Sequence, residues 1–171
     1  MFCYIMLFYY CSMGFMKIKN ILLLTLLISS FSINAQTLKV GDIFPNIKIK
    51  NQFNKSIQIS SETKTVLFSN SKSSSKKLNS FLKNRSGDFM KNHRTHFIAD
   101  VSGMPFLISK FFALPKMRKF PYDVLLISDS KNANFIPKKN GKLTVIKLTN
   151  LKVNSISFVN TTKDLISVFK N

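Results

Sequence analysis

Apolar residues follow two different periods after residue 37, and these periods predict strands that alternate with helices. Some segments alternate apolar and polar side chains, which is typical of a strand with one buried face. Others are short apolar runs, as in a strand that is buried on both faces. The segments expected to form strands are 47–49, 56–59, 65–68, 95–101, 123–127, 143–148 and 153–159.

Three further segments place apolar residues three or four positions apart, which is the spacing of a helix with one buried face. The first follows a polar loop at 69–75. The second begins at Pro105, which suits a first helical turn, and is expected to stop at Pro115. The third opens on 161–164, which resembles a capping box. The expected helices are 78–89, 105–114 and 161–169.

The resulting order is β-β-β-α-β-α-β-β-β-α, with helices between the middle strands and a hairpin plus a helix at the end. This order predicts an α/β sandwich. No internal repeat interrupts it, so one domain accounts for the whole pattern.

Residues 16–35 have the three parts of a secretory signal. Lys17 and Lys19 precede the apolar run 21–28, which is too short to span a bilayer comfortably, and Ala35 is a small residue at the expected cleavage position. We therefore expect 1–35 to be a signal peptide and 36–171 to be one exported, periplasmic domain. An uncleaved membrane anchor is the alternative. The first fifteen residues, which are apolar and lack a basic residue, are interpreted as an over-extended reading of the gene.

The expected mature chain is strongly basic. It has twenty-four Lys and Arg residues and seven acidic ones, which gives a formal charge of +17. Such a chain should adhere to polyanions, which for an exported protein means anionic lipid head groups or other envelope components. A general abundance of Lys and Asn is the alternative explanation. The chain has no Trp, and its densest basic stretch contains few aromatic residues, so no nucleic-acid partner is expected.

The order of elements and three short motifs resemble the thioredoxin-like superfamily, in its exported peroxiredoxin and TlpA-like branch. Residues 40–47, VGDIFPNI, look like the opening segment of those proteins, and 65–71 occupy the place of the strand that leads into the redox motif. Phe120-Pro121 resembles the proline that precedes a central strand in this superfamily. The resemblance implies a thioredoxin-like three-layer sandwich, with a central mixed sheet and helices on both faces. It also implies a cis peptide bond before Pro121.

The chain departs from this superfamily at the residues that carry its chemistry. Both cysteines, Cys3 and Cys11, lie in the segment that we expect to be removed. Where the family has Cys-x-x-Cys or one peroxidatic cysteine, residues 71–75 read SKSSS. Thiol–disulfide exchange needs a thiolate, which a serine hydroxyl does not replace. No redox role therefore carries over to any residue of 36–171.

The serine-rich segment and its lysines are the main candidate site. Hydroxyls, ammonium groups and free backbone N–H groups at a helix N-terminus would form an anion cradle. Simple N-capping in a solvated loop is one alternative. A Ser–Lys nucleophile is another, and it would need a desolvated lysine. The candidate binding residues are Ser71, Lys72, Ser73, Ser75, Lys76 and Pro121.

The stretch 104–118 is apolar on more than one helix face and then turns basic. It is interpreted either as a helix packed on the sheet or as a site for a partner or a membrane surface. His93 and His96 are the only histidines, and with one nearby carboxylate, Asp100, they are a weak metal signal, so no metal site is expected. The chain has no glycine-rich phosphate-binding motif and no cofactor is expected.

These observations predict an exported thioredoxin-like protein that is not an enzyme and that binds a protein partner or an anionic envelope component. One alternative is a hydrolase or transferase that uses Ser and Lys residues within 71–77. The other is a peripheral membrane or polyanion-binding protein that uses its basic surface.

Overall fold

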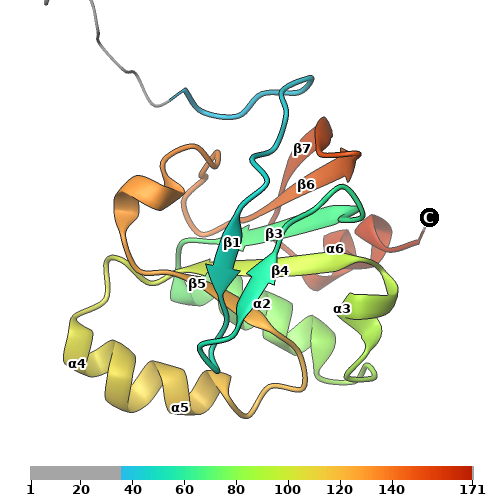
Figure 1. Ribbon diagram of the computed structural model, residues 1–171. Helices are drawn as coiled ribbons and strands as arrows, with labels where there is room; N and C mark the ends of the chain where they lie inside the picture. The colour runs from blue at the N-terminus through green and yellow to red at the C-terminus, as the bar shows by residue number, and fades with distance from the viewer. Residues whose placement is uncertain (1–35, 171) are drawn as a thin grey trace, which may run out of the picture. The chain divides into compact units, whose positions relative to one another are not determined.

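The computed structural model describes residues 36–170, so the expected signal peptide lies outside the described residues. Within them a five-stranded sheet has the order β5-β4-β3-β6-β7, and β1 and β2 form a separate hairpin (Figure 1). The strands are β1 (Lys48–Lys50), β2 (Ser56–Gln58), β3 (Thr65–Ser69), β4 (Thr95–Asp100), β5 (Val124–Ile127), β6 (Leu143–Thr149) and β7 (Lys152–Val159). The helices are α2 (Lys72–Leu82), α3 (Phe89–Asn92), α4 (Phe106–Ile108), the π-helical η1 (Ser109–Ala113), α5 (Leu114–Met117), the 3-10 helix η2 (Ser130–Ala133) and α6 (Thr162–Val168).

β3 is the central strand of the sheet. It pairs in parallel with β4, where Val66 lies opposite His96, and antiparallel with β6, where Val66 lies opposite Ile146. All five residues of β3 are buried, which explains why its sequence is a continuous apolar run. The sheet is therefore mixed, as expected.

Helices α2, α3 and α6 cover one face of the sheet. Leu67 and Phe97 of the sheet are in one core cluster with Leu78 and Phe81 of α2 and Leu165 of α6. These side chains are at most 2 % exposed. Burying an apolar side chain of this size contributes about 1.5–3 kcal/mol to stability.

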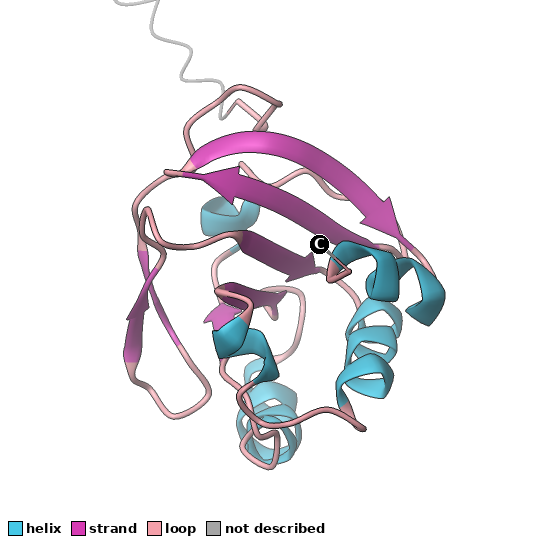
Figure 2. Cartoon of the chain, turned by 90° about the vertical axis from the view of Figure 1, so that its right-hand side faces the viewer, coloured by secondary structure: helices cyan, strands magenta, loops and turns pink. Residues whose placement is uncertain are grey.

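The hairpin and the segment that precedes it cover the opposite face. Phe44 and Ile59 are fully buried there against Val66 and Ile98, and η2 adds Ala133. Figure 2 shows the hairpin on one side of the sheet and helices α2 and α6 on the other. The expected α/β sandwich with three layers is confirmed, although the second outer layer consists mainly of the hairpin and one short 3-10 helix.

Three expected helix boundaries are wrong. The helix expected over 78–89 ends at Leu82, and Phe89 begins the separate helix α3. Helix α2 begins at Lys72 and not at 78, because Ser71 caps it and the supposed polar loop is its first turn. The helical path also continues through Pro115 to Met117. Pro115 lies in the first turn of α5, directly after the π-helical turn, where a missing N–H costs little.

The expected cis peptide bond before Pro121 is also wrong, since residues 36–170 contain no cis peptide bond. Pro121 precedes the edge strand β5 and not a central strand. The strand that lies antiparallel to β3 is β6, and Gly141 and Lys142 precede it. The loop after Pro121 is fixed instead by the buried side chain of Gln52, which bonds the backbone at Tyr122 and Val124.

No helix within residues 36–170 combines the length and the apolar character needed to cross a bilayer.

Candidate functional site

The candidate site begins where β3 ends and α2 begins. Ser69 is the last residue of β3 and is buried, and Ser71 has extended backbone angles that place it at the N-cap of α2. The Ser71 hydroxyl accepts a hydrogen bond from the Ser74 backbone N–H at 3.3 Å. This bond satisfies one of the free N–H groups of the first helical turn.

Five serine hydroxyls form one hydrogen-bonded cluster at this helix start. Ser69 Oγ lies 2.6 Å from Ser74 Oγ and 2.8 Å from Ser75 Oγ. Ser71 Oγ lies 2.8 Å from Ser74 Oγ and 3.1 Å from Ser73 Oγ. No buried side-chain N or O atom within 36–170 lacks a hydrogen-bond partner. The serine cluster is therefore satisfied without a ligand, and its buried part supports the N-terminus of α2.

The neighbouring lysines do not contact the serine hydroxyls. Lys77 Nζ donates to Gly141 O at 3.0 Å and to Asn160 Oδ1, which holds it toward the start of β6. Lys72 and Lys76 are exposed. Among the described hydrogen bonds none joins a lysine amine to a hydroxyl of the cluster. A serine nucleophile needs an adjacent base, and this arrangement supplies none from lysine.

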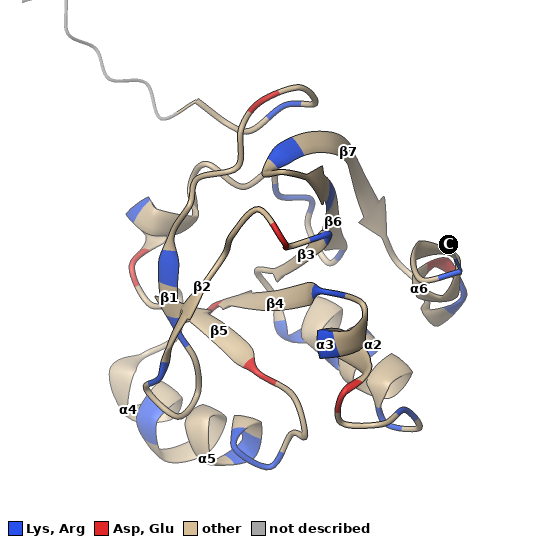
Figure 3. Cartoon of the chain, turned by 45° about the vertical axis from the view of Figure 1, so that its right-hand side comes forward, with Lys and Arg blue, Asp and Glu red and all other residues tan. Residues whose placement is uncertain are grey.

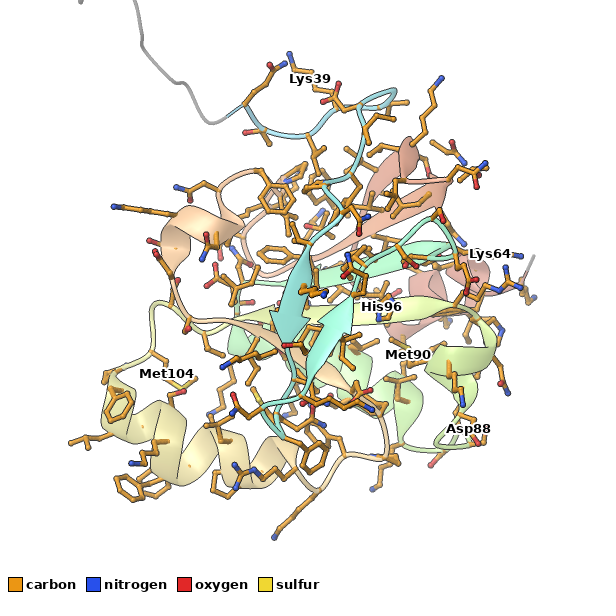
Figure 4. All side chains as sticks on the ribbon, in the orientation of Figure 1. Lys39, Lys64, Asp88, Met90, His96 and Met104 are labelled. Carbon is orange, nitrogen blue, oxygen red and sulfur yellow. The ribbon has the colours of Figure 1, made fainter. Side chains whose placement is uncertain are left out.

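A groove of about 920 Å³ lies between the start of α2 and the α4–α5 segment, which we define as Phe106–Met117. Its apolar walls include Ile108 and Phe112 on one side and Phe97 and Val124 of the sheet on another. Met104, which lies just before α4 (Figure 4), also lines the groove. The volume is within the range of ligand pockets, which are usually lined by apolar side chains with a few placed polar groups.

Basic side chains lie around this groove. Its lining includes Lys72, Lys76, Lys116 and Lys138. Lys138 forms an ion pair with Asp100 at 3.3 Å, the one salt bridge of residues 36–170. Asp100 also lines the groove and is its only acidic residue, so the remaining three lysines give the groove a net positive charge. The N-terminus of the eleven-residue helix α2 adds to the positive potential there.

The structure brings together four of the six residues expected to bind. Ser71, Lys72, Ser75 and Lys76 line the groove, together with the apolar residues of 104–118. Ser73 and Pro121 are not part of its lining. Sequence reasoning missed two further lining residues, Asn79 and Lys138. Asn79 lies on α2 itself, one turn after Ser75 and Lys76, so its helical spacing was the signal that could have found it. Lys138 belongs to no motif, and only the folded chain brings it next to α2.

Pro121 lies instead at a second cavity of about 600 Å³, on the hairpin side of the sheet. Its lining includes His96, Tyr122 and Gly87. The Pro121 carbonyl oxygen would lie only 3.2 Å from a Cβ added at Gly87, so a larger residue at 87 would crowd this loop. The Tyr122 hydroxyl bonds Asn79 Oδ1, and burial raises the pKa of Tyr122 well above its ordinary value.

The two histidines do not form a common site. His93 packs its ring against Phe89 and Phe169, whereas His96 lies on β4 behind the hairpin (Figure 4). Within 36–170 no three His, Asp or Glu side chains are close enough together to hold a metal ion.

Lowering the pH from about 7 to about 5 should destabilise the protein in part through His96. Burial lowers the pKa of His96 from its ordinary value of 6.5, and Asp123 offsets this only in part. The unfolded chain then binds the proton at a higher pH than the folded chain. Stability is therefore lost as the pH falls from the unfolded pKa through the folded pKa. In urea titrations at both pH values, His96→Gln should lose less stability than the unchanged protein. Equal losses would contradict this prediction.

Comparisons with solved structures agree with the fold. A proposed protein disulfide isomerase from Bacteroides thetaiotaomicron matches with a TM-score of 0.52 and 16% identity, over 77% of this chain and 86% of that one. A proposed thioredoxin from Neisseria meningitidis matches with a TM-score of 0.52 and 11% identity, over 75% and 90% of the two chains. The peroxidoxin BcpB from Mycobacterium tuberculosis matches with a TM-score of 0.51 and 14% identity, over 78% and 99%.

No family model and no curated protein sequence matches the chain. At 11–16% identity the structural likeness concerns the fold and not the chemistry. The mixed five-stranded sheet combines a parallel part, β3–β4–β5, with an antiparallel hairpin, β6–β7, and helices pack on the sheet. The chain has a thioredoxin-like fold.

Proposed function

We propose that the chain is an exported binding module without thiol chemistry, and that its groove beside α2 binds an acidic, partly apolar peptide segment of a partner protein. The observation behind this proposal is the groove itself, because it combines apolar walls with unpaired lysines at the start of a helix. A peptide with apolar side chains and carboxylates would match both properties.

The absence of cysteine from 36–171 supports binding rather than exchange of disulfides. The serine cluster supports the same proposal, since its hydroxyls bond one another and not a lysine. For this reason we place binding ahead of the Ser–Lys hydrolase. Export rests on the signal-like residues 16–35, and an N-terminus at Gln36 in the exported protein would support it.

Fluorescence anisotropy with labelled peptides tests the binding proposal on the full chain. The probes are short peptides that alternate Leu or Phe with Asp or Glu, together with the same peptides carrying Lys at each acidic position. We expect the acidic peptides to bind and the lysine peptides not to bind. Lys76→Glu/Lys116→Glu should weaken binding roughly tenfold, since each lost surface pair is worth about 0.2–1 kcal/mol and reversal adds repulsion.

The matched control is Lys163→Glu/Lys170→Glu, which changes the net charge equally. Lys163 lies on α6 and Lys170 follows it, and neither lines the groove. This variant should bind within about twofold of the unchanged chain, apart from long-range effects that salt screens. Equal losses in the two variants would mean that only the overall charge attracts the peptides. The proposed groove would then be wrong.

A further inference from the structure

The α4–α5 segment exposes large apolar side chains between Phe106 and Phe112. None of its twelve residues is buried. Its exposed apolar side chains, with exposed fractions, are Phe106 (72%), Leu107 (62%), Ile108 (46%), Phe111 (61%) and Phe112 (70%). A continuous apolar patch of this kind usually marks a surface that binds something.

The tip of the hairpin lies beside the end of this segment. Arg118, the residue directly after α5, donates from its Nε to the backbone oxygen of Gln52 at 3.1 Å. The next residue, Phe53, is 55% exposed. Figure 1 shows the hairpin tip beside α5. We call the α4–α5 segment together with the adjacent hairpin tip the apolar–basic face.

The charges around this face favour one kind of occupant. Residues 101–122 contain four basic side chains, Lys110, Lys116, Arg118 and Lys119, and no acidic one. Figure 3 shows basic and no acidic positions along α4 and α5. Lys110 Nζ lies 5.6 Å from the Phe106 ring centroid and 5.8 Å from that of Phe111, so a cation sits among the exposed rings. A second copy of the chain would bring these like charges together, whereas anionic head groups above an apolar layer would match both properties.

We propose that the apolar–basic face binds the surface of a bilayer that contains anionic phospholipid. The twelve-residue helical segment, about 18 Å long, would lie in the plane of the interface. Phe106, Leu107 and Phe111 would enter the acyl boundary, and Lys110 and Lys119 would contact the head groups. These five residues are not part of the groove lining, so this inference does not depend on the proposed peptide.

A single tryptophan provides a local test, because the chain has none of its own. Phe111→Trp places the probe on the apolar–basic face of the full chain. Phe158→Trp places the probe on β7, the edge strand at the other end of the sheet from β5. The readouts are the emission maximum and quenching by brominated lipid, with phosphatidylglycerol vesicles and phosphatidylcholine vesicles. Both are local to the probe, so attachment through residues 1–35 would not by itself produce the signal at position 111.

We expect a blue shift and strong quenching for Trp at 111 with phosphatidylglycerol, less with phosphatidylcholine, and little change for Trp at 158. Adding Lys110→Gln/Lys119→Gln should weaken partitioning about 30-fold, or roughly fivefold for each lysine. No quenching at 111, or equal quenching at 111 and 158, would overturn the proposal. A blue shift that appears without vesicles and grows with protein concentration would also overturn it, because a second copy would then cover this face.

Discussion

Replacing Phe81 by alanine should lower the free energy of unfolding by about 3–5 kcal/mol, the usual cost of removing a fully buried aromatic ring. Phe81 is 1% exposed and lies on α2. Its ring stacks on that of Phe169 at 5.5 Å and meets the edge of Phe89 at 5.9 Å. The substitution would therefore open a cavity where α2 meets α3 and the C-terminal segment after α6.

Phe111→Ala is the matched control, because it removes the same ring from a side chain that is 61% exposed. It should change stability by no more than about 0.5 kcal/mol. Urea or thermal unfolding of both variants makes the comparison. If Phe111→Ala also lowers the free energy of unfolding by about 3–5 kcal/mol, the α4–α5 segment is packed against the rest of the chain, and the basis for the apolar–basic face is removed. If both substitutions cost little, the prediction for Phe81 is wrong.

Replacing Gln52 by alanine should destabilise the protein by about 2–4 kcal/mol, because it leaves buried backbone groups without partners. Gln52 is 1% exposed. Its Nε2 donates to Tyr122 O at 2.9 Å, and its Oε1 accepts from Val124 N at 2.7 Å. This one side chain therefore fixes the hairpin to the start of β5.

Gln58→Ala is the control for this prediction. Gln58 lies on β2 and is less buried, and its amide bonds only the exposed side chain of Asn46. It should cost less than about 1 kcal/mol. If Gln52→Ala costs no more than Gln58→Ala in urea unfolding, the hydrogen bonds of Gln52 do not hold the hairpin in place.

Local periodicity was enough to predict the strands, because β3 and β5 are buried on both faces and have the apolar runs of such strands. It failed at helix ends, where one residue decides the outcome. Helix α2 starts six residues earlier than expected because the Ser71 side chain caps it. In the sequence, the serines of this first turn look like a loop. Pro115 fails to stop a helix because a π-helical turn precedes it, and no local pattern indicates that turn.

The candidate site was predictable only where it is local. Ser71, Lys72, Ser75 and Lys76 share the first turns of one helix, so their spacing brought them together. Lys138 reaches the same groove through its ion pair with Asp100, thirty-eight residues away, which depends on the whole topology. Pro121 was wrongly expected to belong to the same site, because its motif is local and the topology is not. A proline before an apolar strand does not reveal whether that strand is central or at the edge.

Insulin reduction by two cysteine variants tests whether this is a thioredoxin-like fold that lost only its sulfur chemistry. The first is the full chain with Cys3→Ser and Cys11→Ser. The second adds Ser71→Cys and Ser74→Cys, where the hydroxyl oxygens already lie 2.8 Å apart and Ser71 caps a helix N-terminus that would lower a thiol pKa. We expect the first protein to match the blank and the second to form an internal disulfide and reduce insulin. Turnover above the blank by the first protein, or no disulfide in the second, would contradict this account.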